Sequence, residues 1–410
     1  MNSQFDVIVF GATSFVGQIL AQYLSDKFNH EGQESLNWAI AGRSQTKLDE
    51  VKAKIQQPNL TTLIADAQDE VAIKAMCDQA RVIISTVGPY ALYGETLVKV
   101  CAESGTDYCD LTGEVQWINR MLLKYEDAAK ASGAHIVHCS GFDSIPSDMG
   151  VYFTQKAAQK SFGEYCNTIA MRVKAAKGGA SGGTIASMLN ITEEVMKDPA
   201  LRKDLVNPYL ICPKDHGFKT RQFDTRKPTF DKTFNGWTAP FIMAAINTRV
   251  VFRSNALADN PYGTDFKYDE AMLVGKGFKG RLTATAIVAG LGAFFIGAAI
   301  KPTRWVLENY VLPKPGEGPS PKEQVEGYYD IRFAGKTPSG KEIRTKVIGQ
   351  GDPGYGSTSQ MLGQVGACLA LDTDLLADKE GGFWTTSTLL GDRLIERLEK
   401  DAQLKFEVIS

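Results

Sequence analysis

The stretch VIVFGATSFVG, residues 7–17, decides the fold that the sequence predicts. Its first part, Val7–Phe10, is a continuous apolar run, which is typical of a strand buried on both faces. The run ends at Gly11, and apolar residues then recur at helical spacing from Phe15 to Leu24. The chain is therefore expected to begin with a strand, a tight turn and a helix, which together open a βαβ unit.

The turn has the residue types of a dinucleotide-binding loop of the Rossmann kind. Gly11 permits a tight turn, the small residue Ser14 lets the backbone approach a diphosphate, and Gly17 lets the helix pack closely on the strand. The free N–H groups at the start of the helix would then face the phosphates. A glycine-bearing turn without a ligand is the alternative. The predicted contacts are Gly11, Thr13, Ser14, Phe15, Val16 and Gly17.

The second predicted strand, Trp38–Ala41, indicates which dinucleotide is bound. NAD-binding loops usually place an acid at its end for the ribose hydroxyls, whereas this chain has Gly42-Arg43-Ser44. A guanidinium at position 43 suits the 2′-phosphate of NADP, and Ser44 and Lys47 would add donors. An Arg43 that stacks on adenine or is solvated is the alternative. Asp66, after the third strand, would accept from the adenine amino group or cap a helix.

A second loop, Thr86-Val87-Gly88-Pro89, follows the fourth predicted strand near the switch point of the sheet. Backbone at this place commonly lies beside the ribose and nicotinamide, so Thr86, Val87, Gly88 and Pro89 are predicted to contact the cofactor. Tyr90 and Tyr93 place hydroxyl groups nearby. Aromatic packing is the alternative for both tyrosines.

Strand-like and helix-like segments alternate up to about residue 150, which predicts a doubly wound parallel sheet with helices on both sides. Residues 151–410 read differently, because several segments alternate between apolar and polar residues. We expect an α+β domain for substrate and dimerisation, with a mainly antiparallel sheet and an apolar insertion around 265–321. Its predicted strands are 167–175, 327–333 and 342–348, and its predicted helices are 184–197, 357–371 and 386–400.

Composition narrows the functional class. The 410 residues carry a net charge of −2, which argues against a nucleic-acid partner. The seven cysteines are scattered without a CxxC pair, and the four histidines form no cluster, so no metal site is predicted. Reduced thiols and a polar start without a secretory signal predict a cytoplasmic protein.

After the sixth predicted strand the chain reads GFDSIPSDMG, residues 141–150. Together with GATSFVG, AGRS and STVGPY, this run resembles the signature of saccharopine dehydrogenase-like oxidoreductases. Within that group the chain is most similar to the trans-acting enoyl reductases, which work with polyketide synthases on lipid precursors. Three later segments agree with this resemblance: residues 182–187, 352–356 and 382–385.

The resemblance implies an NADPH-dependent reduction of a carbon–carbon double bond conjugated to a carbonyl, on a bulky acyl or lipid substrate. It leaves two alternatives: a saccharopine-type amino-acid dehydrogenase, and a nucleotide-binding protein at a membrane or lipid surface without turnover. A homodimer is a further expectation. The proton donor is predicted among Tyr90, Tyr93, Asp143, Tyr152 and water, with Tyr90 and Asp143 as the catalytic candidates. For the run around Asp143, a helix start capped by Ser144 with Pro146 in the first turn is the alternative.

Two further segments have open interpretations. The glycine-rich residues 178–184 would bind an anion at a helix N-terminus or form a hinge. Residues 282–300 are uncharged over about the length of a membrane span. They are expected to form a buried or substrate-lining helix, an interfacial helix or a true span. Basic residues flank the segment on both sides, as at a membrane surface.

Overall fold

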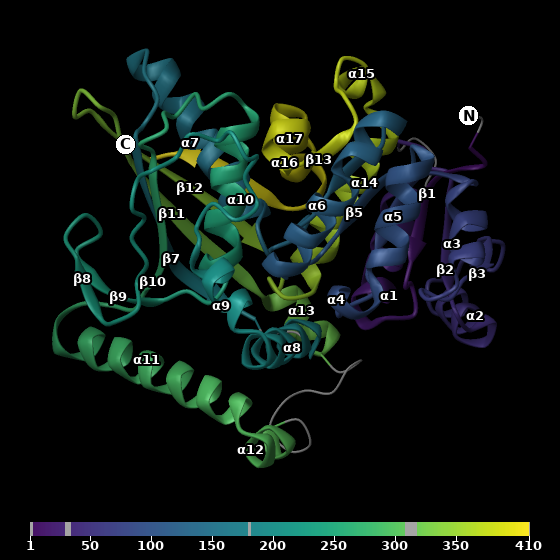
Figure 1. The fold of residues 1–410 in the computed structure, drawn as a ribbon, viewed down its shortest axis with the longest axis horizontal. Coiled ribbons are helices and arrows are strands. Elements are labelled where there is room, and N and C mark those ends of the chain that lie inside the picture. Colours follow the sequence, from purple (N-terminus) through teal and green to yellow (C-terminus); the bar gives the residue numbers. More distant parts are fainter. Residues whose placement is uncertain (1–2, 29–33, 179–181, 308–317, 410) are drawn as a thin grey trace. The chain divides into compact units, whose positions relative to one another are not determined.

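The computed structural model describes residues 3–28, 34–178, 182–307 and 318–409. The chain folds into two compact units (Figure 1). The first comprises Met1–Asp143, Gly316–Gly318 and Gly354–Gln403, and the second comprises the remaining residues. The sequence predicts a single boundary at residue 150. In the structure the first unit ends at Asp143, and the late segment Gly354–Gln403 belongs to it as well.

The first unit is built on a parallel seven-stranded sheet. Its central strand β1 pairs with β2 on one side and with β4 on the other, so the order of strands reverses at β1. The doubly wound sheet predicted from the sequence is confirmed. In spatial order the strands are β13 (Gly382–Trp384), β6 (His135–Val137), β5 (Asp107–Asp110), β4 (Ala80–Ser85), β1 (Phe5–Phe10), β2 (Trp38–Gly42) and β3 (Thr62–Ile64).

Helices cover this sheet in two groups. Helix α5 packs against α3 and α6, while α14 packs against α1 and crosses β1, β4 and β5. The helices of the unit are α1 (Phe15–Phe28), α2 (Gln45–Lys54), α3 (Glu70–Cys77), α4 (Tyr90–Tyr93), α5 (Glu95–Ser104), α6 (Val115–Ser132), α14 (Gly356–Leu371), α15 (Thr373–Leu376), α16 (Thr386–Leu389) and α17 (Gly391–Asp401).

Two expectations about the late segment are corrected. The helix expected at 357–371 packs on the first sheet instead of the second, because nearly all of its side chains are apolar or small and buried. The helix expected at 386–400 is interrupted at Gly391, whose φ of 47° lies in the left-handed region. Strand β13 adds to the parallel sheet beside β6.

The second unit contains a mixed seven-stranded sheet. Strands β11 and β12 alternate strictly between buried and more exposed residues, which gives the sheet one wet face. Strand β7 pairs antiparallel with β11 but parallel with β10, and the other pairs are antiparallel. In spatial order the strands are β14 (Leu404–Val408), β12 (Glu342–Gln350), β11 (Tyr328–Lys336), β7 (Thr168–Lys177), β10 (Lys267–Leu273), β9 (Gly236–Pro240) and β8 (Thr229–Asp231).

The dry face of this sheet is covered by helices α7 and α10. Helix α7 lies very close to β11, because a side chain at Gly150 would stand 2.3 Å from Phe333 Cζ. The predicted α+β class of this part is confirmed. Its helices are α7 (Ile145–Phe162), α8 (Gly182–Lys197), α9 (Pro199–Val206), α10 (Ala244–Leu257), α11 (Gly277–Ala299), α12 (Lys301–Val306) and α13 (Pro321–Glu326).

Candidate active site

The loops after β1 and β4 meet at the switch point of the parallel sheet. Gly11 has a φ of 86°, and a Cβ added there would lie 2.6 Å from Val87 Cγ2 and 2.9 Å from Thr86 Oγ1. The position therefore requires glycine both for its backbone conformation and for the approach of the neighbouring loop. Such a switch point is where open α/β sheets bind ligands.

Hydroxyl groups join the two loops. Ser14 Oγ accepts a hydrogen bond from Gly17 N over 2.9 Å and lies 3.0 Å from Thr86 Oγ1. Thr86 Oγ1 in turn donates to Gly11 O over 2.9 Å. A Cβ on Gly17 would stand only 2.3 Å from Gly11 O, so helix α1 packs directly on the turn. Ser14 thus caps helix α1 and, through Thr86, connects the two loops. These roles add to its small size, on which the prediction for this position is based.

The first turn of α1 retains free hydrogen-bond donors. The backbone N–H groups of Thr13, Phe15 and Val16 donate to no acceptor within the described part of the chain. All three residues are half-buried, so their N–H groups lie in a sheltered turn. Free N–H groups at a helix N-terminus are the donors that a dinucleotide diphosphate requires. The loop therefore fits the cofactor predicted from the sequence.

The end of β2 lies beside this loop, because Gly11 N donates to Ala41 O over 2.9 Å. Arg43 follows directly, is exposed, and forms no hydrogen bond or ion pair with any residue that the structure describes. Ser44 Oγ accepts from Lys47 N at 3.5 Å and caps α2, while the Lys47 side chain is exposed. A free guanidinium and a nearby ammonium fit the extra phosphate of NADP.

Asp66 lies at the end of β3 and is exposed. Its Oδ1 accepts from Gln68 N over 3.0 Å, which closes a turn. The helix that follows, α3, is capped by Asp69, whose carboxylate accepts from Val71 N and Ala72 N. The interpretation of Asp66 as a helix cap is therefore wrong, since Asp69 holds that position.

A buried carboxylate supports the second loop. Glu114 accepts from Tyr90 N over 2.9 Å and from Ala91 N over 3.0 Å, at the start of α4. Gly88 is exposed and Pro89 is half-buried just before these residues. Glu114 thus fixes the end of the Thr86–Pro89 loop. Sequence reasoning missed it, because an isolated acid before a helix is an ordinary surface pattern.

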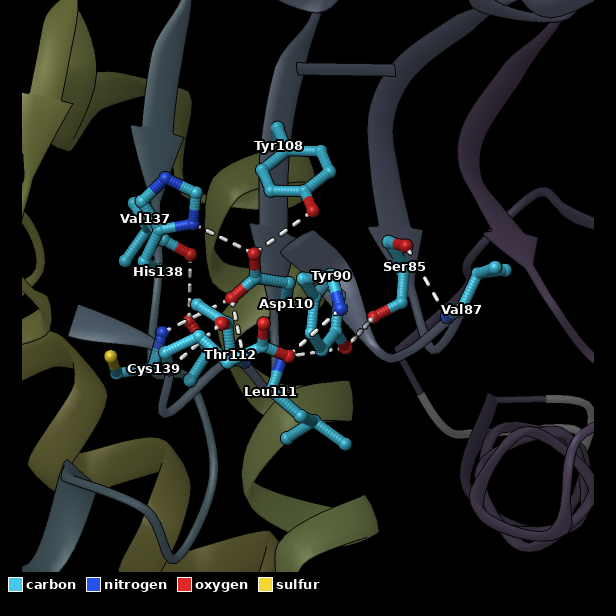
Figure 2. Close-up of polar contacts among 12 residues, drawn as sticks. Ser85, Val87, Tyr90, Tyr108, Asp110, Leu111, Thr112, Val137, His138 and Cys139 are labelled. Carbon is cyan, nitrogen blue, oxygen red and sulfur yellow. Dashed lines mark hydrogen bonds and ion pairs between the residues drawn. The ribbon is translucent and has the colours of Figure 1, made fainter. Parts of the chain in front are cut away.

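The hydroxyl of Tyr90 joins the ends of β4 and β5 (Figure 2). It donates to Ser85 O over 3.0 Å and accepts from Leu111 N over 3.1 Å. Burial raises the pKa of Tyr90 well above its usual value, and the negative charge of Asp110 raises it further. The Tyr90 hydroxyl is therefore engaged on both its donor and its acceptor side.

Asp110 is the centre of a polar cluster at the carboxyl ends of β5 and β6 (Figure 2). Its carboxylate accepts from Tyr108 OH at 2.9 Å, Thr112 N at 3.0 Å, Cys139 N at 3.2 Å and His138 Nδ1 at 2.7 Å. The other ring nitrogen of His138, Nε2, is buried and has no hydrogen-bond partner among the described residues. Neither Asp110 nor His138 was predicted as a site residue.

Asp143 ends the first unit, within the GFDSIPSDMG run. The preceding turn is tightly held, since Phe142 N donates to Thr358 Oγ1 over 3.0 Å and a side chain at Gly141 would lie 2.4 Å from Leu111 Cδ2. Loss of hydration, followed by the negative charge of Asp110, raises the pKa of Asp143 to about 7. This carboxyl group therefore exchanges a proton near neutral pH.

The rest of the run belongs to the second unit. Pro146 occupies the first turn of α7 as expected, but the side chain of Ser144 does not cap this helix. Ser144 Oγ instead donates to Asn247 Oδ1 over 3.0 Å, and Asn247 Nδ2 donates to Glu270 Oε2 over 3.0 Å. Of the glycine-rich residues 178–184, positions 179–181 lie outside the described residues.

Comparison with known proteins agrees with these features. Residues 7–137 match the model of the saccharopine dehydrogenase NADP-binding domain. The chain folds similarly to the L-glutamate-forming saccharopine dehydrogenase of Saccharomyces cerevisiae, with a TM-score of 0.53 over 98% of this chain and 99% of that one. The identity of 13% makes this a likeness of fold alone.

Sequence relatives cover nearly the whole chain. A protein of Mycobacterium tuberculosis named as a candidate trans-acting enoyl reductase is 40% identical over 96% of this chain and 95% of its own length. The trans-acting enoyl reductase of Mycobacterium bovis is 36% identical over 96% of both chains. The chain is thus an NADP-dependent oxidoreductase with the saccharopine dehydrogenase fold, and it belongs to the trans-acting enoyl reductase family.

Proposed function

We propose that this oxidoreductase reduces the carbon–carbon double bond of an enoyl group, conjugated to a carbonyl, in a lipid or polyketide-type acyl substrate. The names of the relatives support this reaction. The observation that carries it is the turn after β1, whose free N–H groups, with the exposed Arg43 after β2, fit NADP. Asp143, a carboxyl group whose pKa is raised to about 7, lies at the end of the same unit. Reduction of an enoyl group consumes one proton for each hydride, so the enzyme needs a group that is protonated near neutral pH.

When bound, NADPH supplies the hydride for such a reduction. A hydride supplied to the electron-poor carbon would leave one proton to be added to the neighbouring carbon, and a residue of this chain would have to donate that proton. We assign the proton donor to Asp143. Tyr90 is assigned a positioning role, because its hydroxyl already donates to Ser85 O and accepts from Leu111 N.

Cofactor contacts are assigned on the same grounds. The free N–H groups of Thr13, Phe15 and Val16 would hold the diphosphate. The guanidinium of Arg43, aided by Ser44 and Lys47, would hold the 2′-phosphate. The further proposed contacts are Gly11, Ser14, Gly17, Asp66, Thr86, Val87, Gly88 and Pro89. We assign the acyl substrate to the second unit, and the location to the cytoplasm at a membrane surface.

The test is oxidation of NADPH by the purified full-length protein with a panel of enoyl thioesters of increasing chain length, followed by the absorbance of the reduced nicotinamide. Turnover with an enoyl thioester and formation of the saturated product are the expected results. NADPH binding without turnover on any panel member would favour a nucleotide-binding protein without catalysis. Turnover of saccharopine with no enoyl turnover would make the protein an amino-acid dehydrogenase.

A further inference from the structure

Helix α11 is apolar around its whole circumference and yet exposed. It is the one described helix that is long and apolar enough to cross a membrane, but only 11% of its most apolar 18-residue window is buried. Phe278 is 78% exposed, Leu282 60% and Ile296 65%, while Phe295 and Ile300 are also exposed. A helix that is hydrophobic all round normally lies in a protein core or in lipid. The described residues therefore leave the outer surface of α11 exposed, although its composition favours an apolar environment.

The charge around this helix has one sign. Between Glu270 and Glu308 the chain has five basic residues and no acidic residue. Lys276 and Lys279 are exposed before the apolar part, and Lys301 is exposed after it. The three lysines form no ion pair with any residue that the structure describes, so their charges are available to a partner. An apolar surface with cations at both ends is complementary to an anionic lipid surface.

Both ends of α11 are attached to the second unit. At the first turn, Gly280 packs against Gly275, and the Arg281 guanidinium lies 5.6 Å from the centre of the Trp237 ring. At the far end, Arg304 in α12 donates to Ala298 O and forms an ion pair with Glu193 of α8 over 2.7 Å. The helix is therefore attached to the second unit at both ends, and the described residues of that unit leave its outer side exposed (Figure 1).

The topology of the sheet excludes a single crossing of a membrane by α11. Strand β10 precedes the helix and strand β11 follows it, and both strands pair with β7. A crossing would leave its two ends on opposite sides of the bilayer. The chain would then have to cross back before β11, but residues 301–327 contain eight charged side chains and no long apolar run. A helix lying along the surface keeps both strands in one sheet.

We propose that α11, with the start of α12, binds in the plane of a bilayer that contains anionic lipid. The exposed Trp305 in α12 would lie at the level of the headgroups, as tryptophan does in membrane interfaces. A second copy of the chain is a poorer partner, because two-fold pairing of α11 would bring the basic ends of both helices together. The proposal names the surface partner of the reductase and does not depend on which bond the enzyme reduces.

The test uses the full-length protein and flotation with vesicles of phosphatidylcholine, with or without phosphatidylglycerol. We expect binding to the anionic vesicles and release by high salt, since surface charges are screened by ions. The double variant Phe295→Glu/Ile296→Glu is expected to lose binding. The control Val71→Glu also places an acid at an exposed apolar position, on α3 in the first unit, and is expected to bind normally.

A second pair of variants tests the charges. Lys276→Gln/Lys279→Gln should weaken binding to anionic vesicles about tenfold or more. Lys214→Gln/Lys219→Gln removes the same charge from another exposed part of the second unit and should change binding little. An equal loss of vesicle binding in the two double variants would overturn the assignment of the lipid-binding surface to α11. Equal binding to neutral and anionic vesicles would overturn the charge complementarity.

Three readouts separate the remaining outcomes. NADPH binding and the melting temperature of the Phe295→Glu/Ile296→Glu variant report on folding. Its turnover on a short, water-soluble enoyl thioester reports on the proposed reaction independently of membrane binding. Absence of vesicle binding by the wild-type protein would overturn the proposal. A wild-type dimer that this variant converts to monomer would do the same, because a second copy would then cover the helix.

Discussion

Asp110 and Asp143 are linked through charge, because the negative charge of Asp110 is the second cause, after burial, of the raised pKa of Asp143. Asp110 is itself fixed by four donors, of which His138 Nδ1 at 2.7 Å is the nearest. The negative charge at the centre of this cluster therefore adds to the effect of burial on the proton affinity of a group on another loop.

Asp143→Asn is expected to lower the rate of enoyl reduction by about 10²-fold or more, because the proposed proton donor is removed. In the wild type, the rate should fall as pH rises through about 7, since the donor loses its proton there. The variant should lack this step in its pH profile. An unchanged step would show that another group donates the proton.

The same substitution should change stability with a definite sign. The pKa of Asp143 rises from 3.8 to about 7 on folding, so the folded state binds this proton more tightly than the unfolded chain. The stabilisation is complete below about pH 4 and is lost as pH rises through about 7. Urea unfolding should therefore show Asp143→Asn gaining stability relative to wild type at pH 8 compared with pH 4. The opposite trend would contradict the raised pKa.

Arg43→Ala should weaken the binding of NADPH much more than the binding of NADH. The difference in binding free energy should be about 1–3 kcal/mol, the range for a lost charged hydrogen bond. Titration of both cofactors by fluorescence measures the difference. The guanidinium of Arg43 forms no hydrogen bond with any residue that the structure describes, so the melting temperature should stay near that of the wild type. If the binding of both cofactors were weakened equally, Arg43 would not be the residue that holds the 2′-phosphate.

Gly17→Ala should destabilise the protein by about 1–3 kcal/mol, because the new Cβ would meet Gly11 O at 2.3 Å. The displaced turn should also bind NADPH less well. Gly292→Ala is the matched control, since nothing lies within 4 Å of that position in α11. There, alanine should be neutral or stabilise the helix by up to about 1 kcal/mol. Thermal unfolding and NADPH titration of both variants provide the comparison.

Arg397→Met should destabilise the first unit by about 3 kcal/mol, because it leaves the buried carboxylate of Asp372 without its main partner. Arg397 also forms a two-point ion pair with Glu34, at 2.8 and 2.9 Å. Arg393→Met removes a second partner of Asp372, but that side chain is 38% exposed and its charge is screened by water, so a much smaller loss of stability is expected. Chemical unfolding measures both, and equal losses would contradict the role of burial.

Local sequence patterns were sufficient to predict strands β1 to β6 of the first sheet and the turn around Gly11. The strand, turn and helix around Gly11 follow from short-range sterics, and the structure places Gly11, Ser14 and Thr86 in contact. Arg43 is exposed, which suits its predicted role in binding the 2′-phosphate of NADP. These features lie within single βα units, so spacing and residue type are enough to predict them.

Other features depend on contacts between distant parts of the chain. Strand β13 joins β6 across more than two hundred residues, and its three residues carry no signal of their partner. Asp110 is the last residue of β5 and His138 directly follows β6, and a polar residue is ordinary at the end of a strand. The proton affinity of Asp143 arises only once burial and the charge of Asp110 act on it.

The return of residues 354–403 to the first sheet has a consequence for protein synthesis. The ribosome delivers every strand from β1 to β6 long before it delivers α14, the helix that crosses β1, β4 and β5. During that interval the apolar area of β1, β4 and β5 that α14 covers is without this helix, and such areas bind chaperones or aggregate. Premature termination anywhere before α14 should therefore yield an insoluble product instead of a smaller working nucleotide-binding module.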